Sequence, residues 1–412
     1  MNDAQNRLTK FQSQLEAAAA RFQSRLETFL QDLVRLRSVN GRQTEAAVAQ
    51  RIVQEAQKLG LQSRFIAAEP RRSNVLVEWG HGPRGFALVG HMDTVAPGDE
   101  AQWTYPPFAA TIDGERLVGR GAADNKAGIA CGLYTLALLR DEGLLDPEDV
   151  RLSLVGVVDE ESGASSPLGV RALLDGGHLD ARGAIYTYCS DIVCVGHRGL
   201  LRLHLRVTGE AVHSGSEAWS RGQGGANAVT GLAAVLLALE KLRVPATPHP
   251  AFAHLDFTIT PGTLVEGGDY ESMVPASAWA MVDARLLPGQ APEAVLETIE
   301  TLVRETLAQR RGVRATVDVK NSLPAAAISV DHRLAQIAAR HAAQFTGRDW
   351  LIRGAGPANE GYMLIAAGVP TLCGFGPQGG NVHAPDEWVA LPSLSTIVAI
   401  YAATIHDYLK ED

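Results

Sequence analysis

Short apolar runs typical of β-strands alternate with helix-length segments in the first part of this chain. The runs read NVLVEW, FALVGH, LSLVGVV and AIYTYC, and AGIACGLYTLALLRDEG between them has the length of a helix. Strands that are apolar on both faces are typical of parallel sheets covered by helices. Helical spacing also marks FLQDLVRLRSV and AAVAQRIVQEAQKLG, the second ending at Gly60 as a C-cap. The pattern predicts an α/β fold with a mostly parallel sheet flanked by helices. Before about residue 22 it predicts a peripheral or frayed helix.

A different pattern begins near residue 200. Six predicted elements follow one another here. In order they are the strand LLRLHLRVTG, the helix GANAVTGLAAVLLALEKL, the strands HLDFTITPGTLVEGG and AWAMVDARLLPG, the helix APEAVLETIETLVRETLAQRRG and the strand VRATVDVK. The order β-α-β-β-α-β is typical of a ferredoxin-like module. Elements of the first kind then resume, with helices predicted around residues 331–346 and 391–409. We therefore predict a domain of residues 1–198 and 319–412 with an inserted domain of residues 199–318.

Composition and charge exclude several partners. The net charge of −9 argues against nucleic acid, because phosphate binding requires a basic face. No apolar run reaches the roughly 18 residues of a membrane span, and the N-terminus lacks the apolar core of a signal peptide. The four cysteines form no CxxC pair and favour free thiols. We expect a cytoplasmic protein that does not bind membranes.

Polar clusters follow three of the predicted strands: HMD after FALVG, DEE after LSLVGVV and CSD after AIYTY. Ligands of open α/β sheets bind beyond the carboxyl ends of the strands. His91 ends one such strand and can bind a metal ion, while Asp93 can hold its other ring nitrogen. Taken alone, this pair also fits a capped loop.

Further carboxylates and a histidine that could bind a metal ion lie in turns and loops elsewhere in the chain. Asp124 occupies a glycine-rich turn, as a helix N-cap or as a carboxylate that approaches two cations. The consecutive acids Asp159, Glu160 and Glu161 raise one another's pKa unless a cation neutralises them, although a solvated loop is the alternative. His383 lies in a Gly/Pro loop, where a histidine is either a site residue or structural.

The motifs GHMDTV, GRGAADNKAG, DEESG, GEAVHSG, GGANAV, VDARLLPG and VHAPDEWV succeed one another from about residue 86 to 390. In this order they resemble the M20-type metallopeptidase and deacylase family. That family includes acetylornithine deacetylase, succinyl-diaminopimelate desuccinylase, glutamate carboxypeptidase, aminoacylase and the carnosine dipeptidases. The resemblance implies a hydrolase of amide C–N bonds with two divalent metal ions, zinc first and cobalt or manganese as alternatives.

The resemblance also implies roles for the first group of residues. Asp124 would bridge the two ions and be followed by a cis peptide bond. His91 would bind one ion, and Glu161 and His383 would bind the other. Glu160 would be the general base that takes a proton from the metal-bound water, and Asp93 would orient His91.

In the inserted domain, which the resemblance implies to be a lid and dimer surface, three residues match the motifs. His213 would stabilise the oxyanion, Asn227 would contact the substrate, and Arg285 would grip a substrate carboxylate. A polar loop and a surface salt bridge are the alternatives for His213 and Arg285. We therefore expect a homodimer and a small-molecule substrate that bears a carboxylate.

Two segments depart from the family pattern. Where many relatives have Glu-Pro-Thr, this chain has YTYCSD, so that a gapless reading places Tyr188 at the position of the remaining metal ligand. A Ser-Asp form of the motif instead selects Asp191, which we predict as that ligand. Residues 354–362, GAGPANEGY, also differ, so the specificity of relatives does not transfer.

Three functional hypotheses follow from these motifs. The first is hydrolysis of an N-acyl amino acid or a short peptide by a deacetylase- or carboxypeptidase-like enzyme. The second is hydrolysis of a non-peptide C–N bond, in an amide, amidine or aromatic amine, on the same metal site. The third is a non-catalytic binding protein, which would have no need of Glu160. Sequence does not identify the substrate.

Overall fold

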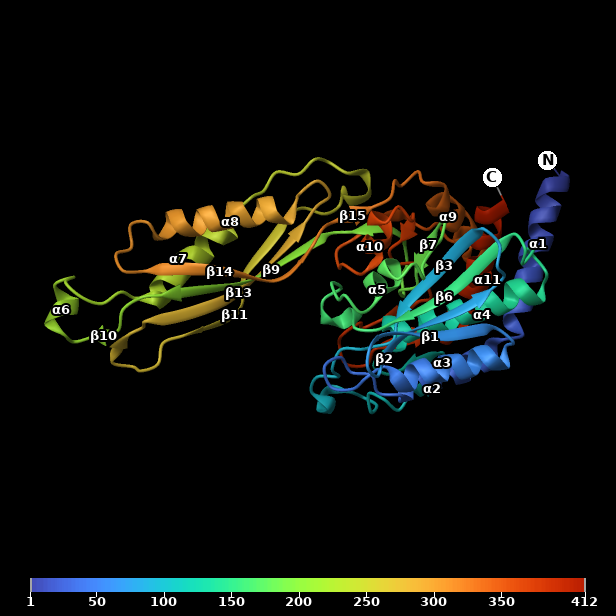
Figure 1. Ribbon diagram of the computed structural model, residues 1–412, viewed down its shortest axis with the longest axis horizontal. Helices are drawn as coiled ribbons and strands as arrows, with labels where there is room; N and C mark the ends of the chain where they lie inside the picture. The colour runs from blue at the N-terminus through green and yellow to red at the C-terminus, as the bar shows by residue number, and fades with distance from the viewer. Residues whose placement is uncertain (1, 411–412) are drawn as a thin grey trace. The chain divides into compact units, whose positions relative to one another are not determined.

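The chain divides into two units, each built around its own sheet (Figure 1). The computed structural model describes residues 2–410. The first unit runs to His197 and also contains Ala327–Ala355 and the residues from Asn359 onward. The second unit comprises Arg198–Ala326 and Gly356–Ala358, so it is inserted between parts of the first.

A six-stranded sheet organises the first unit, in the order β1-β2-β6-β3-β7-β17. Its strands are β1 (Gln62–Glu69), β2 (Arg72–Trp79), β3 (Arg84–His91), β6 (Val150–Val157), β7 (Ala184–Tyr186) and β17 (Thr371–Leu372). β3 pairs in parallel with β6 and β7, and β7 pairs in parallel with β17. Only β1 and β2 introduce antiparallel pairs. The predicted α/β fold with a mostly parallel sheet is confirmed.

Helices cover both faces of this sheet. They are α1 (Asn2–Ala20), α2 (Gln23–Arg35), α3 (Ala46–Lys58), α4 (Ala127–Asp141), α5 (Val170–Asp175), α9 (Arg333–Thr346), α10 (Gly361–Ala366) and α11 (Leu391–Lys410). A Cβ at Gly132 of α4 would touch Leu88 and Leu154 on one face. Ala87 and Val89 on the other face share a core cluster with residues of α5 and α10. None of the helices within residues 2–410 is long and apolar enough to cross a membrane.

The sequence predicts a peripheral or frayed helix before about residue 22, and α1 is a regular helix there. It is regular to Ala20, and Leu15, Ala18 and Ala19 in its second half are buried. α1 packs against α11, and its small alanines allow the two backbones to approach closely. The contact with α11 therefore orders a segment whose own composition is weakly apolar.

A polar cluster joins α9 to α11. The Asp407 carboxylate accepts hydrogen bonds from His341 (2.8 Å), His406 (2.9 Å) and Arg340 (2.7 Å). Burial alone would raise the pKa of Asp407, but the hydrogen bonds and charges of the two histidines hold it below its ordinary value. Asp407 is thus a carboxylate whose charged form the fold favours.

Asp407→Asn is expected to reduce stability at neutral pH and to have less effect in acid. The folded pKa of Asp407 lies below that of the unfolded chain, about 3.9. Its contribution is therefore present above the unfolded pKa and is lost as pH falls through the lower folded pKa. Urea unfolding of wild type and variant from about pH 7 to 3 measures the difference. A difference that stays constant over this range would contradict the assignment.

Smaller sheets complete the first unit. β4 (Thr111–Asp113), β5 (Arg116–Val118), β18 (Gly379–Gly380) and β19 (Trp388–Ala390) form an antiparallel sheet, and β8 (Val193–His197) pairs in parallel with β16 (Ile352–Ala355). Trp388 of β19 pairs with Val118 of β5. This pairing brings the loop after β18 to the turn after β5, although the two are far apart in sequence.

The second unit holds a four-stranded antiparallel sheet in the order β11-β13-β9-β14. Its main elements are β9 (Gly199–Thr208), α7 (Ala228–Glu240), β11 (Thr258–Gly267), β13 (Ser277–Leu286), α8 (Pro292–Leu307) and β14 (Arg314–Leu323). The shorter elements are β10 (Val212–His213), α6 (Glu217–Ser220), β12 (Met273–Val274) and, at the boundary, β15 (Ala326–Ala327). The predicted β-α-β-β-α-β order of the inserted module is confirmed, and β14 continues past residue 318, where the sequence places the domain boundary.

Candidate active site

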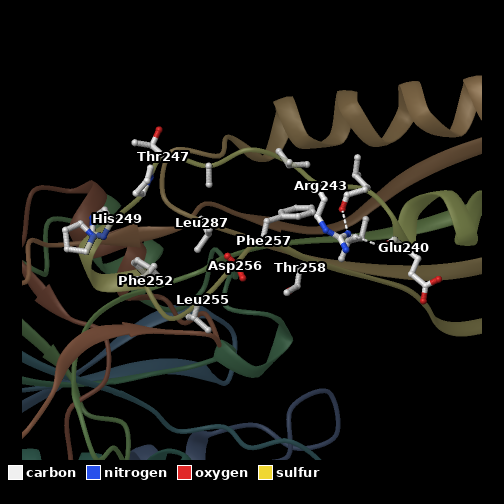
Figure 2. Close-up of a pocket in the computed structure, with 17 residues that line it drawn as sticks. Glu240, Arg243, Thr247, His249, Phe252, Leu255, Asp256, Phe257, Thr258 and Leu287 are labelled. Carbon is white, nitrogen blue, oxygen red and sulfur yellow. Dashed lines mark hydrogen bonds between the residues drawn. The ribbon is translucent and has the colours of Figure 1, made fainter.

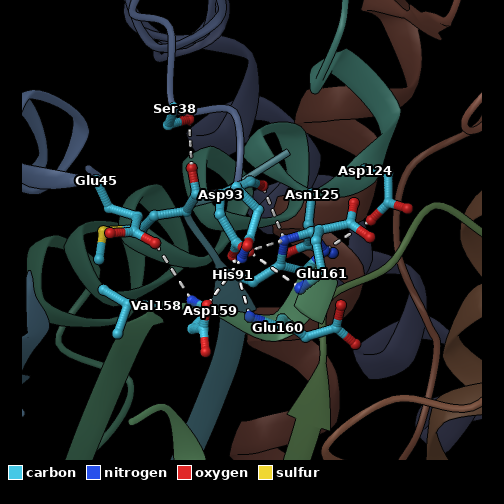
Figure 3. A network of polar contacts seen from close by, with 12 residues as sticks. Ser38, Glu45, His91, Asp93, Asp124, Asn125, Val158, Asp159, Glu160 and Glu161 are labelled. Atoms are coloured by element: carbon cyan, nitrogen blue, oxygen red, sulfur yellow. Dashed lines mark hydrogen bonds and ion pairs between the residues drawn. The ribbon is translucent and has the colours of Figure 1, made fainter. Parts of the chain in front are cut away.

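The carboxyl ends of β3 and β6 bring two of the polar clusters together. His91 is the last residue of β3 and pairs in register with Val157 at the end of β6. Glu160 and Glu161, which begin a short 3-10 turn after β6, therefore lie next to the residues that follow His91. Figure 3 shows the hydrogen bonds that link these two segments.

Asp124 lies in the turn between β5 and α4, and its side chain is nearly buried. The Asp124–Asn125 peptide bond is cis, as the resemblance implies. The buried carboxylate of Glu387 accepts hydrogen bonds from the backbone N–H groups of Gly121 (3.1 Å), Ala123 (2.8 Å) and Asp124 (2.9 Å). Glu387 also pairs with the buried guanidinium of Arg120. A carboxylate from the distant VHAPDEWV motif thus holds the Asp124 turn.

Glu387→Ala is expected to destabilise the first unit by about 3–5 kcal/mol. The substitution leaves the guanidinium of Arg120, which is 1% exposed, without its charge partner and removes the acceptor of the turn. Glu387→Gln should cost less, because an amide oxygen still accepts N–H groups. Urea unfolding measures both losses, with the exposed Glu115→Ala as the control. Equal stability of the Glu387→Ala variant and the control would show that the contacts of Glu387 with Arg120 and the Asp124 turn do not stabilise the first unit.

The candidate metal ligands meet around the carboxylate of Asp124. Its Oδ1 lies 2.7 Å from His91 Nε2, and its Oδ2 lies 3.2 Å from His383 Nε2. His383 Nε2 is also 3.1 Å from Glu161 Oε1. One ligand atom each from His91, Asp124 and Glu161 lies within 4.8 Å of the others. The two oxygens of Asp124 face different histidines, which is the arrangement required of a carboxylate that bridges two ions.

The electrostatics of this group fit a bound dication. Burial opposes the charged form of His91, yet the Asp124 carboxylate raises its pKa well above the ordinary value. Hydrogen bonds to Asp124 and Glu161 raise the pKa of His383 to about 10. The carboxylates therefore attract positive charge, which protons supply here and which a metal ion would supply instead. Imidazole and carboxylate ligands together suit zinc, manganese or cobalt.

Glu160 is buried beside this group, with 5% of its surface exposed. Burial raises its pKa well above the ordinary value; His91 opposes this shift, and the carboxylates of Glu161, Glu360 and Asp124 reinforce it. A carboxyl group in such surroundings can exchange a proton with a reacting group. Its chemistry thus differs from that of Glu161, whose carboxylate pairs with His383.

Asp93 ties the loop after β3 to the loop after β6. Its Oδ1 accepts from Glu160 N (3.3 Å), and its Oδ2 accepts from Glu161 N (3.0 Å) and Asn40 Nδ2 (2.6 Å). His91 Nδ1 lies 3.0 Å from the backbone oxygen of Asp93 and 3.6 Å from its carboxylate. Asp93 therefore holds the Glu160–Glu161 backbone as well as facing His91.

Sequence reasoning missed the residues that support Asp93. Asn40 Nδ2 also donates to Asp159 Oδ1 (3.0 Å), and Arg72 donates to the same oxygen (2.9 Å). Arg72 pairs in addition with the buried carboxylate of Glu45. No local pattern marks Asn40 or Arg72, because their partners come from distant segments. Glu387 does lie in a motif that the sequence singled out, although its contacts were not predicted.

Asp191 is not brought into the ligand group within residues 2–410. Its side chain is exposed, because the Ser190 hydroxyl bonds to both N (3.1 Å) and O (2.8 Å) of Ile192 and so turns the chain locally. Tyr188 is instead the residue of this segment beside the group, with its ring centroid 5.5 Å from that of His91. The structure thus gives no support to Asp191 as the remaining ligand.

The three predicted residues of the inserted module lie in the second unit. His213 is exposed in β10, and its Nδ1 accepts from Gly215 N (3.1 Å). Asn227 caps α7 by accepting from Thr230 N (3.0 Å). Arg285 lies in β13, a central strand, and donates to Asp283 at 2.7 and 3.2 Å. Their predicted contacts with the substrate stay predictions.

A pocket of about 900 Å³ also lies in the second unit (Figure 2). It is lined by the segment that follows α7, by the start of β11 and by Leu287. Arg243 in its wall donates to the backbone oxygens of Glu240 (3.1 Å) and Leu242 (2.9 Å). His213, Asn227 and Arg285 do not line this pocket, so it is separate from the predicted substrate contacts.

Residues 87–407 match the model of peptidase family M20/M25/M40. The chain belongs to this family. The match covers the motifs around His91, Asp124, Glu160 and His383 together with the inserted module. The predicted resemblance is confirmed, and with it the prediction of a metal-dependent hydrolase of amide C–N bonds.

Two kinds of comparison place the chain among M20 proteins. Succinyl-diaminopimelate desuccinylase of Methylorubrum populi is 29% identical over 358 residues, which cover 84% of this chain and 87% of that protein. A tripeptidase structure from Staphylococcus aureus has a TM-score of 0.77 at 19% identity and covers 94% of this chain and 99% of that one. A dinuclear metal-binding M20 peptidase of Bacillus subtilis has a TM-score of 0.71 at 17% identity, with coverages of 95% and 100%. The two structures show the shared fold.

Proposed function

We propose that this enzyme hydrolyses the amide bond of an N-acyl amino acid or a short peptide that carries a free carboxylate. The observation that carries the proposal is the Asp124 carboxylate, which is shared between His91 and His383 with Glu161 alongside. The names of the similar proteins, a desuccinylase and a tripeptidase, support an acylated amino acid or peptide. The acidic net charge argues against a nucleic-acid partner.

The proposal gives each residue of the first unit a task. His91, Asp124, Glu161 and His383 would hold two divalent ions, with zinc preferred over manganese or cobalt. Bound metal of this kind lowers the pKa of water and polarises a carbonyl group. Glu160 would accept the proton of the attacking water and pass it to the leaving nitrogen. Asp93 would fix the orientation of His91 and the backbone that carries Glu160.

The second unit would supply the contacts to the substrate. His213 would stabilise the oxyanion, which is worth roughly 3–4 kcal/mol for such a donor. Asn227 would contact the substrate with the part of its amide that does not cap α7. Arg285 would bind the substrate carboxylate in competition with Asp283, which now holds its guanidinium. A planar guanidinium suits a carboxylate, because both can form paired hydrogen bonds.

A substrate panel tests this proposal. N-acetyl and N-succinyl amino acids, dipeptides and tripeptides are compared with the same compounds carrying an amidated carboxylate. The free-carboxylate compounds should be turned over, and Arg285→Lys should raise their KM. Preferential turnover of non-peptide amides, amidines or aromatic amines would overturn the proposed substrate class and favour the second hypothesis. Arg304→Lys, on the solvent side of α8, serves as the control.

A homodimer is proposed through the edge of the second unit that β11 and α7 form. Val229 and Leu237 of α7 and Leu264 and Val265 of β11 are each at least 36% exposed. A Cβ at Gly267 of β11 would lie 2.8 Å from Val229, so the two apolar stretches adjoin. Exposed apolar groups on an open edge strand favour pairing with another chain.

The opposite edge of the same sheet provides a contrast. β14 carries the charged residues Arg314, Asp318 and Lys320, which protect an edge strand from pairing. Leu264→Glu should therefore convert a dimer into a monomer in light scattering, whereas Val319→Glu on β14 should not. A monomeric wild type, or a dimer that persists in the Leu264→Glu variant, would exclude this interface.

We also propose that the enzyme works in the cytoplasm. Its four cysteines are all free, and Cys131, Cys194 and Cys373 are buried, as predicted from the sequence. Free thiols are typical of proteins that remain in a reducing compartment.

A further inference from the structure

One residue from each of the two segments that depart from the family pattern, Tyr186 and Glu360, meet in the first unit. Tyr186 ends β7, and its hydroxyl donates to Glu360 Oε2 at 3.2 Å. Glu360 immediately precedes α10, is fully buried, and accepts a second hydrogen bond from Val170 N (3.4 Å). Tyr186 and Glu360, one from each of the two segments, are therefore in contact, although the inserted module separates them in sequence.

Two stacked tyrosine rings connect this contact to the candidate metal ligands around Asp124. The rings of Tyr186 and Tyr188 lie 5.1 Å apart at 23°, and the ring of Tyr188 lies 5.5 Å from that of His91. The pair belongs to the same core as Val89 and Val157, on one face of the central sheet. Glu360, Tyr186, Tyr188 and His91 thus follow one another in contact, and the buried Glu360 fixes one end.

The ring of Tyr188 lies beside that of His91 at the candidate ligand group, and the residue is partly buried. A tyrosine hydroxyl, with an ordinary pKa of about 10, is protonated at neutral pH and can donate a hydrogen bond. Within residues 2–410 the hydroxyls of Tyr134, Tyr186, Tyr401 and Tyr408 donate hydrogen bonds, whereas that of Tyr188 donates none. A hydroxyl that lies beside the reacting groups and donates to no protein group can donate its hydrogen bond to a ligand.

We propose that Tyr188 is a further catalytic residue, whose hydroxyl donates a hydrogen bond to a substrate oxygen at the metal-ligand group, and that Tyr186 and Glu360 position it. The inference rests on the proposed hydrolase function. In this proposal Tyr188 occupies the position after the strand where a metal-binding carboxylate would otherwise lie. There it acts as a hydrogen-bond donor to the substrate and does not bind the metal. A neutral donor does not add negative charge to a site that already gathers Asp124, Glu160 and Glu161.

Tyr188→Phe and Tyr186→Phe form a matched pair, because each removes one hydroxyl and keeps the stacked rings. Tyr188→Phe should lower kcat by about 10- to 100-fold with KM changed less than about threefold, the range for a hydrogen bond to a charged group. Metal content by mass spectrometry should equal that of the wild type. Loss of a metal ion would show a ligand and overturn the proposal, as would an unchanged kcat.

Binding of inorganic phosphate to the metal-loaded enzyme gives a second measurement that needs no turnover. Phosphate is a tetrahedral anion that can accept from Tyr188, and calorimetry should show binding at least about fivefold weaker in Tyr188→Phe. Equal affinity would overturn the inference. If wild type binds phosphate more tightly than the variant but hydrolyses no acyl amino acid or peptide, the proposed function fails while the donor assignment stands.

Glu360 provides the test of positioning. Glu360→Gln keeps an oxygen that accepts from the Tyr186 hydroxyl, so kcat should stay within about threefold of the wild-type value. Glu360→Ala and Tyr186→Phe each remove this hydrogen bond, and both should lower kcat. The KM and metal content of both variants should match wild type. Equal loss of kcat in Glu360→Gln and Glu360→Ala would contradict the positioning role and indicate a general loss of packing.

Discussion

Glu160→Gln should lower kcat by about 10²- to 10⁴-fold while leaving both metal ions bound. The side chain is buried beside Asp124 and Glu161, and its backbone is fixed by Asp93. Glutamine has nearly the same shape but cannot accept the proton of an attacking water. KM should change little, because the proton moves only as the reaction proceeds.

A substitution of the neighbouring Glu161 distinguishes the role of a general base from that of a metal ligand. Glu161→Gln should reduce metal content, because Glu161 faces His383 in the ligand group. Metal content by mass spectrometry and kcat are measured for both variants, with the exposed Glu69→Gln as the control. Full activity in Glu160→Gln would rule out the general-base assignment, and metal loss in that variant would make Glu160 a ligand.

Removal of metal by a chelator should abolish turnover, and zinc, manganese or cobalt should restore it. Without metal, the positive charge near Asp124 comes from protonated histidines, and the pKa of His383 is raised to about 10. A metal ion must displace that proton, so metal affinity should rise with pH through the neutral range. Calorimetry in buffers of different ionisation enthalpy measures the released protons.

Metal removal should also lower stability, because an ion that binds only the folded chain stabilises it by about 2.7 kcal/mol at 100 times its dissociation constant. The thermal midpoint of the metal-free enzyme should therefore fall and recover on reconstitution. Asp124→Asn, which weakens the shared carboxylate, should show little difference between treated and untreated protein. Turnover that persists after complete removal of metal would refute the metallohydrolase mechanism for this chain.

Much of the fold could be predicted from local patterns. Apolar runs and helical spacing report burial along a single element, so β2, β3, β6, β7 and α4 were predicted close to where they lie. The β-α-β-β-α-β order of the second unit followed from the same signals. β1 was missed, because QSRFIAAE is mostly exposed and lacks a clear alternation of burial. Helix α1 was predicted as peripheral or frayed, and its contact with α11 cannot be inferred from its own composition.

The residues of the candidate ligand group follow strand ends or lie in distinctive motifs, which is why the sequence singled them out. His91 and the Glu160–Glu161 pair end neighbouring parallel strands, and the order of the motifs added Asp124 and His383. The rule that the carboxyl ends of parallel strands share one edge of a sheet accounts for His91 and the Glu160–Glu161 pair. That Asp124 and His383 join them was implied by the family resemblance of the motifs.

Only the tertiary structure decided which other side chains complete the site. Glu387 meets the Asp124 turn because β19 pairs with β5, and Asn40 reaches both Asp93 and Asp159 from a loop without a distinctive pattern. The path of the chain after β7 places Tyr188 beside His91 and leaves Asp191 exposed. Contacts of this kind depend on backbone positions set by long-range packing, and no local period of hydrophobic residues records them.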